Sequence, residues 1–454
     1  MEYQKVKALS VAETVPEVLM KTPPVWDWAI SLAAVLGLLV LTYVAFSGSL
    51  FRPLFGIHSQ TRSTNLIIRP SILWAMMGYV LLMFRTLLWI RYKPKPPCNF
   101  DDAPSLTVII PAYNEGSMVE LAIDSVAAAR YPGDRIEILV VDDGSRDDTW
   151  LYMQKAAGRH PGLVTTIRFT ENQGKRAALA EGFRRARGEV VVSIDSDSVI
   201  ERDTLLELVG PFRDPVVGAV AGKVVAYNRH TGFIPKMLHV RFVLSFDFLR
   251  AVQSTYGTVY CCPGALSAYR TAVVRQFLDA WLNQTFLGEK CTYGEDRSLT
   301  NFIFSCGFNS VYQRNAVVHT TVPETYSKLC RMFLRWDRSF VKEELRLIRL
   351  LWKRPYPARI ISIIDCFVTN LRYPVSYMTL GLLVYYTVQN PMTFVRVLFM
   401  IGFISALNMV YYLRSERSWD CIYGVFYSYF AFFTLFWIFP YALATLRSRS
   451  WMTR

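Results

Sequence analysis

The sequence has 454 residues, of which 52% are hydrophobic, 14% aromatic and 19% charged, a mixture that fits a purely soluble enzyme poorly and a membrane protein with an aqueous domain well. The net charge of +14 favours anionic partners such as nucleotide diphosphates and lipid head groups. We expect no nucleic-acid partner, since no such motif occurs. The eight cysteines and five histidines lack metal-ligand spacing, which argues against a zinc site.

Residues 1–100 contain two predicted transmembrane helices. Residues 28–46 form a charge-free run of 19 residues, long enough to span a bilayer. Ser71–Ile90 is the second, and Arg85 near its end can extend toward the head groups. Three basic residues follow directly: Arg91, Lys93 and Lys95. A basic flank marks the cytoplasmic side, so we expect a multi-pass protein of the cell membrane whose next domain is cytosolic.

Residues 101–330 alternate between predicted strands and helices. The strands are expected at 106–110, 136–141, 164–169 and 189–194, with helices that include 118–129 and 175–187. This alternation predicts a Rossmann-like α/β domain, with a mostly parallel sheet and helices on both faces. Ligands of such sheets bind beyond the carboxyl ends of the strands. Polar residues at those ends are therefore candidates for a site.

Asp142, Asp143 and Gly144 close the second predicted strand. A carboxylate there can accept hydrogen bonds from a uracil or a ribose, and the glycine permits a turn close to a ligand. Lys175 follows Gly174 at the start of a helix, where the helix amino end and a cation together favour a phosphate. A solvated basic face is the alternative for Lys175.

Asp195 and Asp197 close the fourth predicted strand. Two carboxylates at this spacing can share Mg²⁺ or Mn²⁺, which would neutralise a leaving diphosphate. The same spacing occurs in surface loops, but its position directly after a strand favours a metal site.

Glu295 and Asp296 supply the remaining acidic pair. Sugar transfer with inversion needs one base to deprotonate the attacking hydroxyl, and we assign Asp296 to this role, with Glu295 orienting or binding the acceptor. A structural Asp296–Arg297 pair is the alternative. Further along, Arg335 offers a diphosphate contact and Trp336 a flat stacking surface for a sugar.

The segment 331–358 is predicted to form amphipathic helices at the membrane surface, because 331–359 holds nine Lys or Arg against three acidic residues with apolar residues interleaved. A helix in a soluble core is the alternative. Residues 359–454 form a C-terminal transmembrane region, with apolar stretches at 360–388, 397–413 and 421–446. The first contains Asp365 and Pro374, so it is either one tilted helix or a broken pair, and the number of passes stays open.

Together these motifs resemble the processive family 2 glycosyltransferases, and within them most closely the hyaluronan synthases and the chitooligosaccharide synthases of nodulating bacteria. The motifs that carry the resemblance are Pro111-Ala-Tyr-Asn-Glu115, Asp142-Asp143-Gly144, Asp195-Ser-Asp197, Gly294-Glu-Asp296 and Arg335-Trp336. The resemblance implies a GT-A fold for 101–330 within a helical multi-pass membrane protein.

The resemblance also implies roles for single residues. The UDP-sugar would be held by Ala112, Tyr113, Glu115, Asp142, Asp143, Lys175, Asp195 and Arg335. Asp195 and Asp197 would bind Mg²⁺ or Mn²⁺, and Asp296 would be the base. The acceptor would contact Cys261, Gly264, Tyr269 and Trp336. A C-terminal Trp-x-Thr-Arg tail, comprising Trp451, Thr453 and Arg454, resembles a gate over the active site.

The implied function is an inverting β-glycosyltransferase that polymerises a UDP-sugar, N-acetylglucosamine and/or glucuronate, and exports the polysaccharide through its own membrane helices. Met332 stands where the family has Gln, and Pro263 and Ala265 replace Ser and Pro, so the identity of the sugar stays open. The alternatives are a transferase that adds a single sugar to a lipid carrier, a synthase of another N-acetylglucosamine or glucose polymer, and a transporter or scaffold with an inactive enzyme domain.

Overall fold

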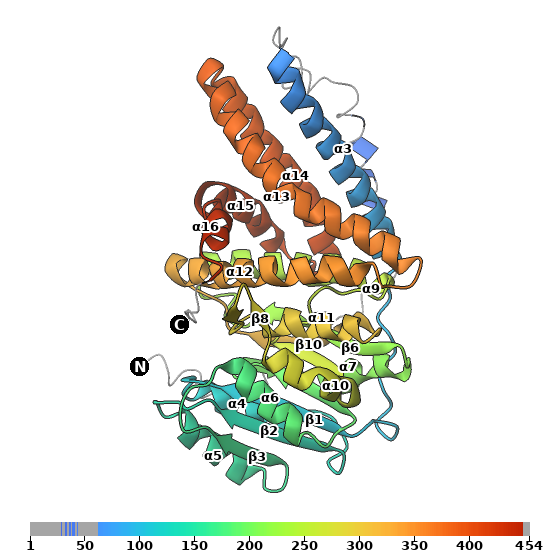
Figure 1. Ribbon diagram of the computed structural model, residues 1–454, viewed down its shortest axis with the longest axis vertical. Helices are drawn as coiled ribbons and strands as arrows, with labels where there is room; N and C mark the ends of the chain where they lie inside the picture. The colour runs from blue at the N-terminus through green and yellow to red at the C-terminus, as the bar shows by residue number, and fades with distance from the viewer. Residues whose placement is uncertain are drawn as a thin grey trace.

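The computed structural model describes residues 62–447 and a few positions between 29 and 43, with side chains from residue 77 onward in the continuous part. More than half of the predicted span at 28–46 lies outside these residues, and the tail at 451–454 lies wholly outside them. An α/β domain forms one end of the described chain, and long helices rise from the other (Figure 1).

The domain is built on an eight-stranded sheet of order β3-β2-β1-β4-β7-β6-β10-β5. In chain order the strands are β1 (Leu106–Ala112), β2 (Ile136–Asp142), β3 (Val164–Arg168), β4 (Val190–Ile194), β5 (Ser198–Ile200), β6 (Val217–Ala226), β7 (Leu266–Arg270) and β10 (Asn309–Thr320). β1 to β4 are parallel, as predicted. The rest is mixed, because β7 runs antiparallel to both of its neighbours and β5 antiparallel to β10. The expectation of a mostly parallel sheet therefore holds for one half.

Helices pack around this sheet and complete its core. Those of the domain are α4 (Met118–Ala127), α5 (Thr149–Arg159), α6 (Lys175–Arg185), α7 (Thr204–Val209), η3 (Gly210–Arg213), α8 (Phe233–Val243), η4 (Leu244–Arg250), α9 (Ala251–Thr255), α10 (Thr271–Leu282) and α11 (Glu295–Ser305). A two-stranded hairpin, β8 (Thr285–Phe286) with β9 (Glu289–Lys290), precedes α11. β1 is buried along its whole length, which explains its uninterrupted apolar sequence.

The predicted amphipathic segment is a single helix, α12 (Tyr326–Leu351), which lies across the domain (Figure 1). One face packs on the domain and buries apolar residues such as Leu329 and Phe333, while Leu345 and Ile348 are exposed. α12 therefore lies at the boundary between the α/β domain and the long helices.

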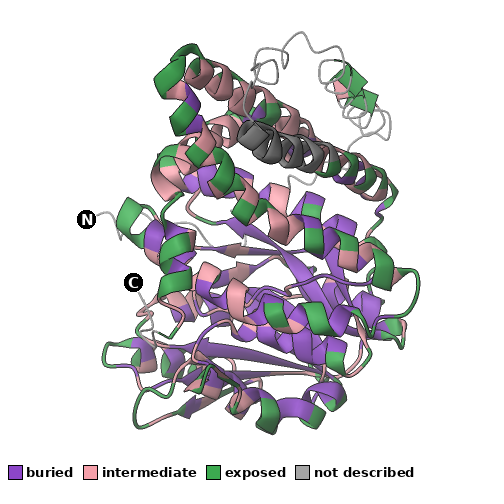
Figure 2. Cartoon of the chain, turned by 45° about the horizontal axis from the view of Figure 1, so that its top comes forward, coloured by how far each residue is buried: buried purple, intermediate pink, exposed green. Residues whose placement is uncertain are grey.

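Beyond α12 lie α3 (Arg62–Arg91), α13 (Ala358–Gln389) and α14 (Met392–Glu416), followed by η5 (Trp419–Cys421), α15 (Ile422–Phe430), η6 (Ala431–Leu435) and α16 (Ile438–Ala444). α13 is one continuous helix despite Pro374, which decides between the two alternatives for 360–388. The long helices carry mostly exposed and intermediate residues, whereas the strands of the large sheet are mostly buried (Figure 2).

Within the described residues, α14 is long and apolar enough to cross a membrane, and only 6% of its most apolar stretch is buried in the chain. The bent pair formed by 419–435 and Ile438–Ala444, at 45°, gives a second candidate span. The multi-pass arrangement with spans at 71–90 and 360–388 stays a prediction.

A buried charge cluster attaches α14 to the α/β domain. The Lys223 ammonium of β6 lies 2.8 Å from Asp247 Oδ2 and 2.9 Å from Glu416 Oε1, at the end of α14. Arg314 Nε approaches Asp247 Oδ1 to 3.3 Å. Because buried charges are costly unless they are paired, this cluster fixes the position of α14 on the domain.

Candidate active site

The parallel strands bring the predicted nucleotide residues to one edge of the sheet. Ala112 and Asp142 end β1 and β2 and are register partners. Asp195 follows β4, which pairs with the other side of β1. The two loops beyond β1 and β2 are joined, since the amides of Glu115 and Gly116 both donate to the Thr149 hydroxyl, at 2.8 and 2.9 Å.

Asp142 and Asp143 both bind neighbouring backbone. Asp142 Oδ1 accepts from the Ser145 amide at 2.9 Å, and the two oxygens of Asp143 accept from the amides of Gln173 and Gly174 at 2.8 and 2.9 Å. Burial raises the pKa of Asp143 to about 6. These contacts shape the loops at the sheet edge, and direct binding of a nucleotide by the two aspartates stays a prediction.

A hollow of about 450 Å³ opens beside this aspartate pair. Its lining residues are Gly144, Ser145, Arg146, Arg168, Phe169, Thr170, Glu171 and Asn172. Gly144 has a φ of +71°, and a Cβ there would lie 2.6 Å from the backbone carbon of Glu171. Only glycine fits this turn, because a side chain there would collide with the Glu171 backbone. Its closeness to a ligand stays a prediction.

Lys175, the first residue of α6, links two of the predicted acidic clusters. Its ammonium nitrogen lies 2.5 Å from Asp195 Oδ1 and 3.1 Å from Glu295 Oε1. Burial disfavours the charged ammonium, but the two carboxylates outweigh it and raise the pKa of Lys175. Lys175 therefore stays protonated at the centre of the site. A Cβ at Gly264 would lie 3.0 Å from the same nitrogen, which places Gly264 against this cluster.

Glu295 and Asp296 occupy the first turn of α11, after Gly294 in a left-handed conformation. Burial and the neighbouring Glu295 raise the pKa of Asp296. For Glu295 burial acts in the same direction, but Lys175 and, to a lesser extent, Arg335 outweigh it and lower its pKa. The pair is thus divided into an ionised Glu295 and a more basic Asp296, which suits proton abstraction by Asp296.

Cys261 lies beside this carboxylate, with Sγ 3.5 Å from Asp296 Oδ2. The following amide, of Cys262, donates to the Thr300 hydroxyl at 3.0 Å, and Thr300 donates to the Asp296 carbonyl at 2.9 Å. The loop that carries both cysteines is therefore bound to the helix that carries the candidate base.

The Arg297 side chain pairs with Glu344 of α12, at 2.7 Å between Nη1 and Oε2. Towards Asp296, Arg297 offers its backbone amide, which lies 2.7 Å from Oδ1. The structural Asp296–Arg297 pair considered as an alternative for these residues is thus replaced by an Arg297–Glu344 pair.

Trp336 on α12 has a side chain that is 38% exposed and packs at a ring-centroid distance of 5.6 Å on Phe333 and 6.2 Å on Phe242. A supported, partly exposed indole is suited to stack on a sugar. Met332, which stands where the family has Gln, packs against the hydrophobic core.

Asp197 Oδ1 accepts from the hydroxyls of Ser198, at 3.3 Å, and Thr320, at 3.2 Å. In the described part of the chain, no group of three or more His, Cys, Asp or Glu residues could by itself hold a metal ion. Two carboxylates completed by substrate phosphates are nevertheless a common Mg²⁺ site. Asp195 and Asp197 fit such a shared site.

Comparison with known proteins identifies the family. Residues 107–278 match the model of glycosyl transferase family 2. An N-acetylglucosaminyltransferase of Azorhizobium caulinodans is 30% identical over 77% of this chain and 87% of its own length. A hyaluronan synthase of Streptococcus pyogenes serotype M1 is 31% identical over 77% of this chain and 83% of its own length. The chain belongs to glycosyl transferase family 2.

A solved structure supports the fold of this family 2 enzyme. The mannosyltransferase PcManGT from Pyrobaculum calidifontis, in complex with GDP-Man and Mn²⁺, aligns with a TM-score of 0.57 and 24% identity, covering 80% of this chain and 98% of that one. The predicted GT-A α/β fold is therefore confirmed. The predicted glycosyltransferase activity is confirmed by the family 2 match and the two relatives.

Tyr269 of this glycosyltransferase, expected to contact the acceptor, is fully buried in β7, where its ring lies edge-on to Phe183 at 6.4 Å. Its contact with the acceptor stays a prediction.

Sequence reasoning also missed residues of this site. Thr320 and Glu344 contact Asp197 and Arg297 across 123 and 47 positions of sequence, respectively. The sequence does carry a signal for Thr320, because it follows the apolar run 316–318, which is typical of a buried strand. For Glu344 the basic and acidic pattern of α12 indicated only a surface helix. The predicted gate, Trp451, Thr453 and Arg454, lies beyond the residues that the structure describes.

Proposed function

We propose that this enzyme is a membrane-embedded inverting β-glycosyltransferase that polymerises UDP-N-acetylglucosamine and/or UDP-glucuronate and exports the polymer through its own membrane helices. The observation that carries the proposal is the Lys175–Asp195–Glu295 cluster beside the more basic Asp296, with the exposed Trp336 on the overlying α12. The names of the two relatives, an N-acetylglucosaminyltransferase and a hyaluronan synthase, support these sugars.

In the proposed reaction, Asp296 accepts the proton of the acceptor hydroxyl as its oxygen bonds to the anomeric carbon of the donor. The bond from that carbon to the phosphate oxygen breaks on the opposite face, and UDP leaves. Lys175, with its retained positive charge, stabilises the anionic groups around the departing diphosphate. The backbone amide of Arg297 orients the Asp296 carboxylate.

Asp195 and Asp197 would hold a divalent cation, Mg²⁺ or Mn²⁺, which would neutralise the diphosphate when bound. Support comes from the hard oxygen donors of the two aspartates and from the Mn²⁺ bound to the mannosyltransferase of the same fold. Ser198 and Thr320 fix one oxygen of Asp197 through their hydroxyls, which orients this carboxylate before a cation arrives.

The proposed location is the cell membrane, with the α/β domain in the cytosol. α14 supplies one apolar helix, and the basic α12 lies between the domain and the long helices, where head groups would surround it. The lipid bilayer and the growing polysaccharide would then be the partners, with α12 at the point where the polymer enters the membrane.

The second candidate, transfer of a single sugar to a lipid carrier, is favoured by Met332 in place of the family glutamine. Purified protein in lipid nanodiscs would be given UDP-N-acetylglucosamine and UDP-glucuronate, singly and together, with Mg²⁺ or Mn²⁺. UDP release and product length on a gel would be measured. A ladder of long products is expected, whereas one added sugar would overturn polymerisation.

The base would be tested in the same assay. Asp296→Asn should lower UDP release by at least about 100-fold, because the proton acceptor is lost. The matched control is Asp279→Asn, since the Asp279 side chain is 86% exposed and forms a surface salt bridge with Arg184. Undiminished UDP release by Asp296→Asn would remove Asp296 from the role of base.

A further inference from the structure

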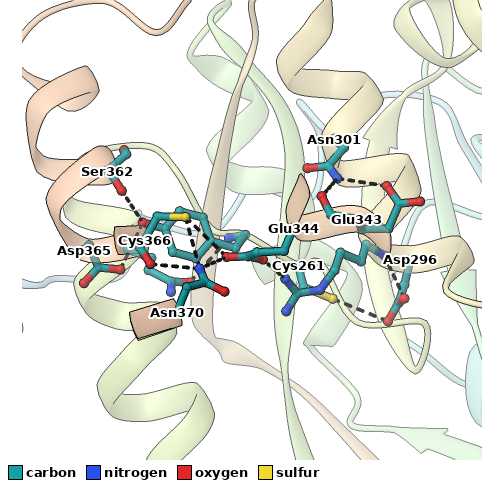
Figure 3. Close-up of polar contacts among 12 residues, drawn as sticks. Cys261, Asp296, Asn301, Glu343, Glu344, Ser362, Asp365, Cys366 and Asn370 are labelled. Carbon is teal, nitrogen blue, oxygen red and sulfur yellow. Dashed lines mark hydrogen bonds and ion pairs between the residues drawn. The ribbon is translucent and has the colours of Figure 1, made fainter. Parts of the chain in front are cut away.

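A buried carboxylate on α12 pairs with the arginine that follows the candidate base. Glu344 is 5% exposed, and its Oε2 lies 2.7 Å from Arg297 Nη1. Arg297 directly follows Asp296, yet its guanidinium is directed to α12 and lies over the Phe340 ring at 4.9 Å. Figure 3 shows Glu344 between the Asp296 side of the site and helix α13.

The other oxygen of Glu344 binds α13. Oε1 accepts from Asn370 Nδ2 at 2.7 Å and from Cys366 Sγ at 3.3 Å (Figure 3). Asn370 also donates to the Cys366 carbonyl at 2.8 Å, so its amide is held in this orientation. The Glu344 carboxylate thus joins three helices: α11 with the base, α12, and α13.

A charged partner is needed to keep Arg297 in this place. The Arg297 side chain is only 20% exposed, so its guanidinium is stabilised by a compensating charge, and breaking such an ion pair makes the remaining ion seek another partner. The Asp296 carboxylate is the adjacent candidate, because it already interacts electrostatically with Arg297. A direct salt bridge would draw the lone pairs of Asp296 away from the acceptor hydroxyl and make it a weaker base.

Other ionisable groups also face Asp296 and set the background for this effect. They are Lys175 of α6, Arg250 of η4, Cys261 and Cys262 of the following loop, Tyr269 of β7, and Glu295 and Arg297 of its own helix. Within this set, Arg297 is bound by a carboxylate from α12. Glu344 therefore connects α12 and α13 to the residue next to the base.

We propose that Glu344 is a positioning residue, which holds the Arg297 guanidinium away from Asp296 and fixes the start of α11 against α13. This inference rests on the proposed role of Asp296 as the base. Through this contact the arrangement of α13, a helix of the predicted membrane region, determines whether Asp296 is available to the acceptor.

The test is Glu344→Gln, which keeps the size of the side chain and one of its two acceptor oxygens but removes its charge. UDP release would be measured against pH in nanodiscs. We expect kcat near neutral pH to fall about tenfold, because the salt-bridged Asp296 is a weaker base, while KM for the donor changes less than about twofold. The acidic limb of the kcat profile should move down by about one pH unit, as is typical of a carboxylate that gains a cationic partner.

Glu343→Gln is the matched control. Glu343 is adjacent on α12 and is 3% exposed, but its carboxylate accepts hydrogen bonds from Gln284 and Asn301 instead of from Arg297. Figure 3 shows the contact with Asn301. This variant shares the loss of a buried charge, so its thermal unfolding temperature should fall comparably, while its acidic limb should stay at the wild-type pH. Glu344→Asp, which keeps the charge, should restore part of the lost kcat.

A double variant tests whether Glu344 acts through Arg297. Adding Arg297→Gln to Glu344→Gln should return the acidic limb of the kcat profile to the pH seen for Arg297→Gln alone. In Arg297→Gln this limb should lie at the wild-type pH or higher, because a cation near Asp296 has been removed. Equal profiles for Glu344→Gln and Glu343→Gln would overturn the proposal. If Glu344→Gln does not fold, a downward shift in Arg297→Gln alone would overturn it. Activity retained by Asp296→Asn would instead overturn the base assignment in the proposed function.

Discussion

The Lys175 ammonium lies 2.5 Å from an Asp195 carboxylate oxygen, so the residue that begins α6 is bound to the carboxylate that follows β4. Asp195 and Glu295 both pair with this cation. Replacing Lys175 by Met removes the charge and leaves two carboxylates facing each other in a largely buried site. UDP release should fall by about 100-fold or more. The control is Lys290→Met, because Lys290 is an exposed residue of the β8–β9 hairpin; a similar loss in Lys290→Met would contradict a specific role for Lys175.

Gly264→Ala tests how closely this cluster is packed. The added methyl would lie 3.0 Å from Lys175 Nζ, which is too close, and 3.5 Å from Asp195 Oδ1, which is an ordinary van der Waals contact. The ammonium can move, so we expect a folded protein whose kcat is reduced about tenfold by a misplaced charge. Gly133→Ala is the control, since nothing lies within 4 Å of its added methyl. Wild-type kcat in Gly264→Ala would show that the position of Lys175 is not critical.

Gly294→Ala should destabilise the start of α11. Gly294 has a φ of +80°, and its added Cβ would collide with the Ser339 hydroxyl of α12. Gly307 has a φ of +86° but open space around it, so Gly307→Ala measures the backbone cost alone, about 1–2 kcal/mol. Thermal unfolding in detergent should show a larger loss for Gly294→Ala than for Gly307→Ala. The double variant with Ser339→Gly should recover the difference, and equal losses in the two single variants would rule out the collision.

Thr320→Val should weaken binding of the proposed divalent cation. It removes the hydroxyl that donates to Asp197 Oδ1 at 3.2 Å but keeps the shape of the side chain. Loss of such an orienting contact typically costs about tenfold in metal affinity. Mn²⁺ binding in the presence of UDP would be measured by electron paramagnetic resonance, with Thr165→Val on the exposed side of β3 as the control. Unchanged Mn²⁺ affinity would separate Thr320 from the metal site, and retention of UDP release after EDTA treatment would argue against a metal altogether.

Lys223→Met should loosen α14 from the α/β domain. The substitution removes the ammonium that lies 2.8 Å from Asp247 and 2.9 Å from Glu416. The free energy of unfolding should fall by about 3–5 kcal/mol. The control is Arg130→Met in the exposed pair with Asp203, at 3.7 Å, where the cost should stay below about 1 kcal/mol. Thermal unfolding of both variants would be compared. Equal unfolding temperatures would mean that the buried cluster contributes little.

The parallel half of the sheet and most of the candidate site could be predicted from the amino-acid sequence. β1, β2 and β4 are short apolar runs that end at Ala112, Asp142 and Ile194, and parallel strands bring such ends to one edge. The acidic residues could be found because they follow strands or begin a helix, which is a local pattern. The family motifs then connected these positions to sugar transfer.

The pairing among these residues, in contrast, became visible only in the folded chain. Lys175 meets Asp195 and Glu295, Thr320 meets Asp197, and Arg297 meets Glu344 instead of its neighbour Asp296. The antiparallel placement of β7 and the burial of Tyr269 likewise depend on strand pairing across the sheet. The local propensity of a residue carries no information about such partners. A long-range ion pair forms only after packing has removed both groups from water and brought the two opposite charges next to each other.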